Sequence, residues 1–476
     1  MNENLRRILE KKGPIKKIGV IGMGYVGIPS AAIFADSPAY DFVWGFQRNS
    51  SSSGYKIAML NKGECPLDGT EPGLRELIER IVKKNKFECT YDMTKIAEVD
   101  TVTIAVETPF QNRNKLLANY DSLIEALRKT GKYMTEGVLV VIESTVTPGV
   151  TQGIARKILE EESGMRAGVD FFLAHAPERV MPGRLLKNIQ EYDRVVGGID
   201  DSSTERATEL YTPILTKGEV IPVSAIAAEF SKTAENALRD LQIAAVNELA
   251  IYCEGLGIDF YDVKKAIDSL EGKGVSRAVL FPGAGVGGHC LPKDTYHLMR
   301  SLNENGVSSN FSMDSDSLFL RARNINDFMP QHMYNLTTSA LESVGQSLQS
   351  TKVVILGWAY NRNTDDSRNT PAEPYRDLVL QSGAEVEIHD PYVKDYGEIR
   401  IAKDLESVLG GADVIAVFTA HDDYADLDLN KVKRLSGKDR TVIVDGRNVF
   451  DPEEVINSGF IYRGIGRGDK NNTRPG

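Results

Sequence analysis

The chain is poor in cysteine, and its few cysteines are not arranged for a disulfide framework or a structural metal. Among 476 residues there are four, namely Cys65, Cys89, Cys253 and Cys290. None belongs to a C-x-x-C pair, which zinc sites and small disulfide-bonded folds typically contain. We therefore expect free thiols, a cytoplasmic location and no bound metal.

Long apolar runs and an excess of positive charge are also lacking. No stretch approaches the about 18 consecutive apolar residues of a membrane span. Residues 1–17 are charged, without the apolar core of a signal peptide. The net charge of -11 disfavours general binding to DNA or RNA, whose phosphates require a concentrated positive surface. These absences predict a protein without a membrane or nucleic-acid partner.

The composition that remains is that of an ordinary globular protein. Apolar residues make up 41% of the chain and charged residues 26%. At about 150 residues per domain, the length predicts two or three domains.

A glycine motif near the N-terminus has the context of a dinucleotide site. The apolar run 18–21 predicts a strand, and residues 28–35 predict a helix. A G-x-G-x-x-G turn between a strand and a helix lets a dinucleotide pyrophosphate approach the backbone at the helix N-terminus. The residues predicted to hold the cofactor are Gly22, Gly24, Tyr25, Val26 and Gly27.

The next strand, 42–46, ends without the acidic residue that accepts the ribose hydroxyls of NAD. Gln47 and Arg48 stand there instead. An arginine beside an uncharged residue can accommodate the 2′-phosphate of NADP, whereas a glutamine can also bond the ribose beside a solvated arginine. NAD and NADP both remain open at this point.

Further apolar runs at 100–106, 137–142 and 171–174 predict buried parallel strands. Loops at the carboxyl ends of such strands line the ligand crevice. The candidate residues in these loops are Thr108, Thr145 and Glu178.

From Ala227 the pattern becomes that of a long helix. Lys232 and Asn236 are four residues apart and share one face. The simpler interpretation is a solvated lysine with an asparagine neighbour. The apolar flanks instead favour a central helix, in which a lysine and an asparagine need polar partners.

A glycine-crowded loop, 283–288, leads to Cys290 and then to Asp294. Such a loop can present a thiol nucleophile to a bound substrate. The alternative is an inert cysteine buried in a turn, because free cysteine is among the most buried residue types.

The last part of the chain repeats the α/β pattern without a full glycine motif. Strands are predicted at 352–357, 386–391, 413–418 and 441–445. Their loops carry Arg362, Asp366, Arg368 and Arg447, which suit a diphosphate. We predict an α/β protein with two Rossmann-like doubly wound domains joined by a central helical segment with a long helix. The expected boundaries are 1–213, 214–330 and 331–476.

Several of these motifs occur together in one family. GxGYVG, STVTPG, PERVMPG, the helix with Lys232 and Asn236, GGHCxPKD, and YNRNTDDSRNTPA with its later DGRN resemble the UDP-glucose/GDP-mannose dehydrogenase family over about residues 15 to 465. The sequences around Glu178, Asn236 and Cys290 are most similar to its UDP-N-acetylhexosamine 6-dehydrogenase branch. UDP-glucose and GDP-mannose remain alternative substrates.

The resemblance implies a four-electron oxidation of C6 of a UDP-sugar to the uronate, used for surface polysaccharides. Two NAD molecules would be reduced. Cys290 corresponds to the nucleophile that forms a thiohemiacetal and then a thioester. Lys232 and Asn236 correspond to the residues that stabilise the oxyanion, and Asp294, Glu178 and Thr145 to those that transfer protons and place water.

The resemblance also implies substrate contacts and a homodimer or higher homo-oligomer, paired through the long helix. The gluco, manno or galacto epimer stays open. The implied substrate-binding residues are Glu178, Arg179, Lys232, Asn236, Arg239, Asn247, Phe281, Gly285, Gly288, Arg368 and Arg447, with Arg277 reaching across a subunit boundary.

Two other classes of function compete with this interpretation. A two-electron NAD(P)-dependent hydroxyacid dehydrogenase would share the first domain and a helical domain, but it needs neither a cysteine nor the third domain. A nucleotide-sugar-binding module without turnover would not need Cys290, Lys232 and Asn236 intact.

Overall fold

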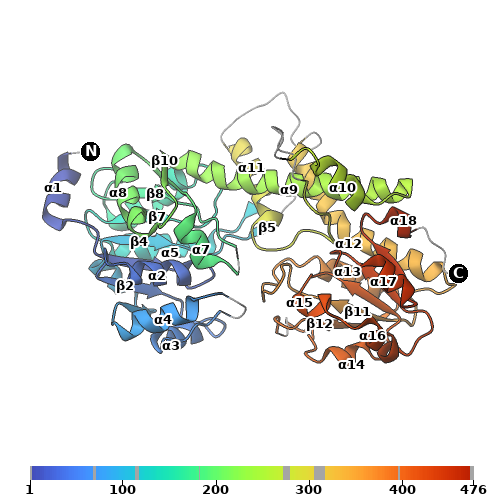
Figure 1. Cartoon of the computed structure of the whole chain (residues 1–476). Helices are drawn as coiled ribbons and strands as arrows, with labels where there is room; N and C mark the ends of the chain where they lie inside the picture. The colour runs from blue at the N-terminus through green and yellow to red at the C-terminus, as the bar shows by residue number, and fades with distance from the viewer. Residues whose placement is uncertain are drawn as a thin grey trace. The chain divides into compact units, whose positions relative to one another are not determined.

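The computed structural model describes residues 3–67, 71–112, 117–181, 183–271, 279–304, 317–394 and 397–471. The chain divides into two compact units (Figure 1). The first contains residues 1–235 and 296–309, and the second contains residues 236–295 and 310–476. Each unit is described by itself below.

The first unit is built on an eight-stranded sheet in the order β10-β9-β8-β7-β4-β1-β2-β3. Its strands are β1 Lys17–Ile21, β2 Phe42–Phe46, β3 Phe87–Thr90, β4 Thr101–Ile104, β7 Leu139–Ile142, β8 Phe172–His175, β9 Arg194–Gly198 and β10 Val220–Ser224. The chain order reverses between β1 and β4, the place where doubly wound folds bind ligands. Loops after β1 and β4 therefore flank the expected cofactor site.

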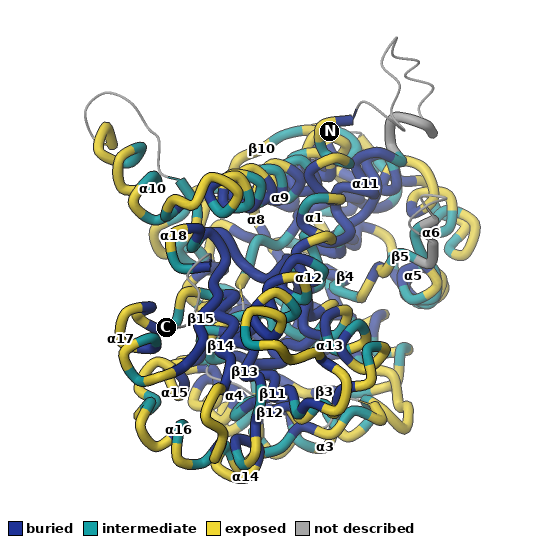
Figure 2. The backbone as a smooth tube through the Cα atoms, turned by 90° about the vertical axis from the view of Figure 1, so that its right-hand side faces the viewer, coloured by how far each residue is buried: buried dark blue, intermediate teal, exposed yellow. Residues whose placement is uncertain are grey.

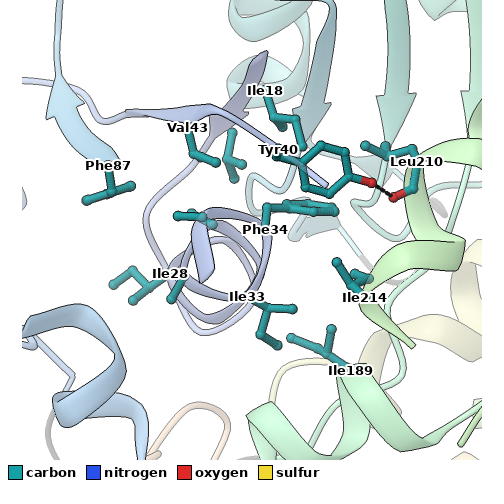
Figure 3. Packing of buried hydrophobic residues seen from close by; sticks show 14 of the residues in the cluster. Ile18, Ile28, Ile33, Phe34, Tyr40, Val43, Phe87, Ile189, Leu210 and Ile214 are labelled. Atoms are coloured by element: carbon teal, nitrogen blue, oxygen red, sulfur yellow. Dashed lines mark hydrogen bonds between the residues drawn. The ribbon is translucent and has the colours of Figure 1, made fainter. Parts of the chain in front are cut away.

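Helices cover this sheet, and α2 is the one that starts at the glycine turn. Residues 27–35 of α2 are all buried, because the helix is apolar on every side. Figure 3 shows Phe34 beside Tyr40, whose hydroxyl donates to the carbonyl of Leu210. The α-helices of this part are α1 Glu3–Lys12, α2 Gly27–Asp36, α3 Tyr55–Asn61, α4 Leu74–Lys83, α5 Asp121–Tyr133, α6 Arg156–Ser163, α7 Leu185–Glu191 and α8 Asp201–Tyr211. Two short antiparallel strands, β5 Phe110–Asn112 and β6 Leu117–Ala118, pair with each other outside the main sheet.

Three strands of this sheet, β3, β9 and β10, are absent from the sequence-based expectation. β9 runs antiparallel to β8, and β10 pairs parallel to β9 at the edge. β10 is partly exposed and contains Pro222, which only an edge strand tolerates. The part after residue 213, expected to be helical, therefore begins with a strand of the first sheet.

The second unit holds a five-stranded parallel sheet in the order β12-β11-β13-β14-β15. Its strands are β11 Lys352–Leu356, β12 Glu385–His389, β13 Val414–Val417, β14 Val442–Asp445 and β15 Ile461–Gly464. Figure 2 shows the buried sheet strands and the exposed outer sides of its helices. The remaining helices of the chain are α9 Ala225–Leu256, α10 Phe260–Asp268, α11 Leu291–Glu304, α12 Leu318–Glu342, α13 Ala372–Gln381, α14 Leu405–Leu409, α15 Asp422–Ala425, α16 Leu429–Ser436, α17 Pro452–Asn457 and α18 Gly468–Asn471.

A buried polar network joins α9 to α12 within the second unit. Arg323 and Asp240, both fully buried, form an ion pair at 2.5 Å. The amide of Asn326 donates to the Asp240 carboxylate at 2.8 Å and accepts from Asn247 at 2.9 Å. Because buried charges are costly unless paired, this network fixes how the two helices pack.

The predicted fold class is confirmed: two Rossmann-like parallel sheets and a central helical segment make an α/β protein. α9, predicted from Ala227, runs over 32 residues. In the described part of the chain, no helix is long and apolar enough to cross a bilayer.

The last residue of β8, His175, predicts a pH dependence of stability. Burial, together with the nearby Arg194 cation, lowers the pKa of its ring from 6.5 to about 3. Between these values the unfolded chain binds a proton that the folded chain does not, so stability falls as the pH falls, by at most about 1.4 kcal/mol per pH unit. The melting temperature of the wild type should therefore fall relative to that of His175→Leu between about pH 6.5 and about pH 5. A temperature difference that is independent of pH would show that the folded ring titrates normally.

Candidate active site

The turn between β1 and α2 has the geometry of a dinucleotide cradle. Gly22 has φ +101°, which residues with a side chain rarely adopt. A Cβ on Gly27 would lie 1.9 Å from the carbonyl oxygen of Gly22, so only glycine lets the helix pack on the turn. Gly24 has no other group within 4 Å of its Cβ position, which leaves space beside the backbone for a ligand. These features fit a dinucleotide pyrophosphate at the start of α2.

The flanks of the turn are partly covered by protein. Tyr25 packs at the edge of the main hydrophobic cluster, and Val26 precedes the first residue of α2. At the end of β2, the side-chain oxygen of Gln47 accepts from the amide of Met23 at 3.0 Å, while Arg48 points to Glu125 at 3.8 Å. Gln47 thus supports the turn directly.

The loops after β4 and β7 are held together. The hydroxyl of Thr108 donates to the carbonyl of Thr145 at 2.6 Å. The Ser144 hydroxyl accepts from the amide of Val106 at 2.9 Å and donates to its carbonyl at 2.6 Å. Two of the predicted cofactor residues therefore lie side by side at the carboxyl ends of neighbouring strands.

Glu178 belongs to a buried cluster of charges that the sequence did not predict. Arg194, at the start of β9, forms ion pairs with Glu178 and with Glu143, the latter at 2.8 Å. The Tyr211 hydroxyl donates to Glu143 at 2.7 Å, and its ring lies 4.2 Å from the guanidinium. Arg194 thereby holds the Glu178 carboxylate in one orientation. The sequence signal that could have revealed this cluster is Arg194, a charged residue at the start of an otherwise apolar strand.

Two predicted substrate-binding cations of the first unit, Arg179 and Lys232, differ in their surroundings. Arg179 pairs with Glu235 at 3.5 Å and donates to the carbonyl of Asp193. Lys232, on α9, is only 7% exposed, yet its ammonium has no hydrogen bond or ion pair to any described residue. An ammonium without a partner among the described residues is suited to an anionic ligand.

In the second unit, Cys290 directly precedes α11. Its carbonyl accepts from the amides of Lys293 and Asp294, at 3.0 Å and 2.9 Å, in the first turn of the helix. The fully buried carboxylate of Asp294 accepts from the side-chain amide of Asn236. Three of the predicted catalytic residues are thus brought together at the N-terminus of α11.

The glycines before Cys290 are packed against protein. Gly285 and Gly288 have φ of +132° and +88°. A Cβ on Gly285 would lie 2.7 Å from Pro371, and one on Gly288 would lie 2.8 Å from the ring of Tyr360. The glycines therefore allow this loop to pack closely against Pro371 and Tyr360.

Arg368 and Tyr360, in the loop after β11, lie against the glycine loop that precedes the thiol. The amide of Gly288 donates to the carbonyl of Arg368 at 2.8 Å, and Arg368 pairs with Asp366 at 2.5 Å. Burial raises the pKa of the Tyr360 phenol, and the nearby Asp366 and Cys290 raise this pKa further. The hydrogen bond between Gly288 and Arg368 connects the loop before Cys290 to the loop after β11.

The other predicted substrate residues differ in accessibility. The guanidinium of Arg447 donates to the carbonyl of Phe418 at 2.9 Å, and burial lowers its pKa. It forms no ion pair with a carboxylate in the part of the chain that the structure describes. Asn247 is fully buried, and its side-chain oxygen accepts from the amide of Gly283 at 3.0 Å. Arg239 and Phe281 are exposed, the latter by 65%, and Arg277 lies outside the described residues.

Comparison with known proteins covers almost the whole chain. The UDP-glucose/GDP-mannose dehydrogenase family matches with its NAD binding domain over residues 16–215, its central domain over 226–326 and its UDP binding domain over 354–452. A UDP-N-acetyl-D-mannosamine dehydrogenase of Pyrococcus horikoshii is 35% identical over 454 residues, which cover 95% of this chain and 100% of that protein.

Solved structures agree with this assignment. The structure of an NDP-N-acetyl-D-galactosaminuronic acid dehydrogenase from Methanosarcina mazei has a TM-score of 0.87 and 57% identity, covering 99% of this chain and 100% of the other. A UDP-glucose dehydrogenase from Pyrobaculum islandicum has a TM-score of 0.78 and 28% identity, covering 95% and 98%. The expected family and the NAD cofactor are thereby confirmed. The chain belongs to the UDP-glucose/GDP-mannose dehydrogenase family and is an NAD-dependent dehydrogenase of nucleotide sugars.

Proposed function

We propose that the protein oxidises C6 of a UDP-N-acetylhexosamine to the carboxylate, in two successive two-electron steps that use Cys290 as nucleophile. The observation that carries the proposal is the arrangement around this thiol. Cys290 directly precedes α11, Asp294 in the first turn of that helix is hydrogen-bonded to Asn236, and the amide of Gly288 donates to the carbonyl of Arg368. A two-electron dehydrogenase has no use for a cysteine held in this way.

When bound, NAD accepts a hydride in each oxidation. The Cys290 thiolate adds to the aldehyde carbon formed first, so that a C–S bond forms and the carbonyl oxygen becomes an oxyanion. We propose that Lys232 and Asn236 donate hydrogen bonds to this oxygen, since the mostly buried Lys232 has no hydrogen bond or ion pair to another described residue. Loss of the second hydride then gives the thioester.

Water attack on the thioester releases the uronate and returns the thiol. We propose that Glu178 and Thr145 place this water, because Arg194 keeps Glu178 in a fixed orientation. Asp294, hydrogen-bonded to Asn236, is the proposed proton acceptor beside Cys290. The three parts expected from the sequence, with boundaries near 213 and 330, would then serve cofactor, catalysis and nucleotide binding.

Nucleotide recognition falls to the second unit in this proposal. Arg447 is a cation without a carboxylate partner among the described residues, beside the backbone of Gly283. A diphosphate would supply the missing negative charge. The sugar contacts expected for Arg239, Asn247, Phe281, Gly285, Gly288 and Arg179 stay predictions, and the buried Asn247 supports the loop at Gly283.

The identity of the amino sugar is inferred from the relatives. The structure at 57% identity is named for N-acetyl-D-galactosaminuronic acid, and the Pyrococcus horikoshii protein for N-acetyl-D-mannosamine. We propose UDP-N-acetylgalactosamine first and the manno and gluco epimers next. The product class, a UDP-linked hexosaminuronate, is a building block for surface polysaccharides.

The proposal predicts two reduced cofactors per sugar consumed. The purified protein would be incubated with UDP-N-acetylgalactosamine, its manno and gluco epimers, UDP-glucose and GDP-mannose, and both reduced cofactor and uronate would be measured. A ratio near one would rule out the four-electron reaction. Faster turnover of UDP-glucose or GDP-mannose would show that the acetamido sugar is not the preferred substrate. Binding without turnover would indicate a sensor.

Two cysteine variants locate the nucleophile in the same assay. Cys290→Ser should lower steady-state formation of the uronate by at least about a thousandfold, because the thioester cannot form. Cys253→Ser, which changes a buried thiol of α9, is the control and should keep the wild-type ratio. Normal turnover of Cys290→Ser would remove Cys290 from the mechanism.

We further propose that two copies of the chain pair through α9. Phe230, Leu238, Leu249, Tyr252 and Leu256 are between 40% and 74% exposed, and their spacing places them on one face of the helix. A continuous exposed apolar stripe of this length is typical of an interface between subunits.

A single charge on this stripe should disrupt the dimer. Leu249→Lys would place an ammonium in the middle of the apolar contact, and light scattering after gel filtration should show a shift towards the monomer mass. Leu380→Lys, at an equally exposed leucine of α13, should leave the mass unchanged. A dimer that persists in Leu249→Lys would exclude this face as the interface.

A further inference from the structure

The loop after β2 has an unusual chemistry for a site that receives NAD. Residues 47–56 read Gln-Arg-Asn-Ser-Ser-Ser-Ser-Gly-Tyr-Lys and contain no acidic residue. In NAD sites a carboxylate at this strand end accepts hydrogen bonds from the adenosine ribose hydroxyls. This chain offers hydroxyls and cations instead.

Gln47 cannot easily replace the missing carboxylate. Its side-chain oxygen accepts from the amide of Met23 at 3.0 Å, and its side-chain nitrogen donates to the hydroxyl of Ser53 at 2.9 Å. The oxygen and the nitrogen of this amide therefore connect the glycine turn to the four serines 50–53, which we call the serine loop. The loop is held beside the turn where the adenosine end of a dinucleotide begins.

Arg48 is available for a ligand. Its side chain is 59% exposed, and among the described residues its ion-pair partner is Glu125, at 3.8 Å. Glu125 is itself 44% exposed and pairs more closely with Lys129, at 2.7 Å. Exposed pairs of this kind contribute little, so a phosphate can take the guanidinium at little cost.

The serine loop supplies further donors near Arg48. The hydroxyl of Ser50 is hydrogen-bonded to that of Ser53 at 2.7 Å and lies 3.3 Å from that of Ser52. On the other side, the ammonium of Lys56 donates to the carbonyl of Met23 at 3.0 Å. A phosphate dianion would meet a guanidinium, hydroxyl donors and no opposing carboxylate within the loop.

We propose that Arg48 and the hydroxyls of Ser50, Ser52 and Ser53 form a subsite for the 2′-phosphate of NADP, so that the protein binds NADP as well as NAD. The guanidinium binds phosphate oxygens with charge-assisted hydrogen bonds, which the ribose hydroxyl of NAD cannot match. This inference concerns the first unit alone and does not depend on the role of Cys290.

Binding measurements test the subsite without turnover. Adenosine 2′,5′-bisphosphate and 5′-AMP differ only in the 2′-phosphate, as NADPH and NADH do, and dissociation constants for both pairs are obtained by calorimetry and fluorescence. The quantity of interest is the preference for the 2′-phosphorylated member. Arg48→Ala should reduce this preference by about fivefold or more, because one charge-assisted contact is lost. Affinity for NADH should change by less than about twofold.

Two further variants make the result unambiguous. Arg128→Ala removes an equally exposed arginine of α5 and should leave the preference unchanged. Gln47→Glu keeps the acceptor for the Met23 amide but adds a negative charge, and it should lower the preference as well. A preference that falls by less than fivefold in Arg48→Ala, or equally in Arg128→Ala, would overturn the proposal.

Discussion

The ion pair between Asp240 and Arg323 is the contact on which the arrangement of the second unit depends. Both side chains are fully buried, so removing either would leave an uncompensated charge at a cost of about 3–5 kcal/mol. Asn326 and Asn247 extend the pair as a chain of hydrogen bonds to the amide of Gly283. The loop that leads to Cys290 is thereby attached to the packing of α9 on α12, and its position follows from buried polar groups that must find partners.

The first unit also contains buried ion pairs, near the end of its sheet. Arg194 lies between Glu143 and Glu178, and the three buried charges neutralise one another only in part. Arg194 thereby orients Glu178, to which the proposed mechanism assigns the placement of water. In both units, therefore, a buried ion pair between different elements of the fold fixes a segment that carries candidate site residues.

Much of the fold and several candidate residues could be predicted from the sequence. Runs such as 18–21 and 353–356 are apolar throughout, as strands covered on both faces must be, and both are buried in strands. Three strands of the first sheet escaped prediction: β3 and β10 at its edges, the latter with Pro222, and β9, which begins with Arg194. β9 pairs with β8 and β10 pairs with β9, and such contacts leave little local pattern in the sequence.

Local patterns in the sequence were enough to predict the family and the NAD cofactor, because a glycine turn between strand and helix and the motifs around Lys232, Asn236 and Cys290 are contiguous stretches of chain. The partners of the side chains came only with the tertiary structure. That Arg194 holds Glu178, that Gly288 lies against Tyr360, and that Gln47 bonds Met23 and Ser53 depends on folding. The strength of a charge or hydrogen bond depends on burial and on neighbours from distant segments, neither of which a local pattern contains.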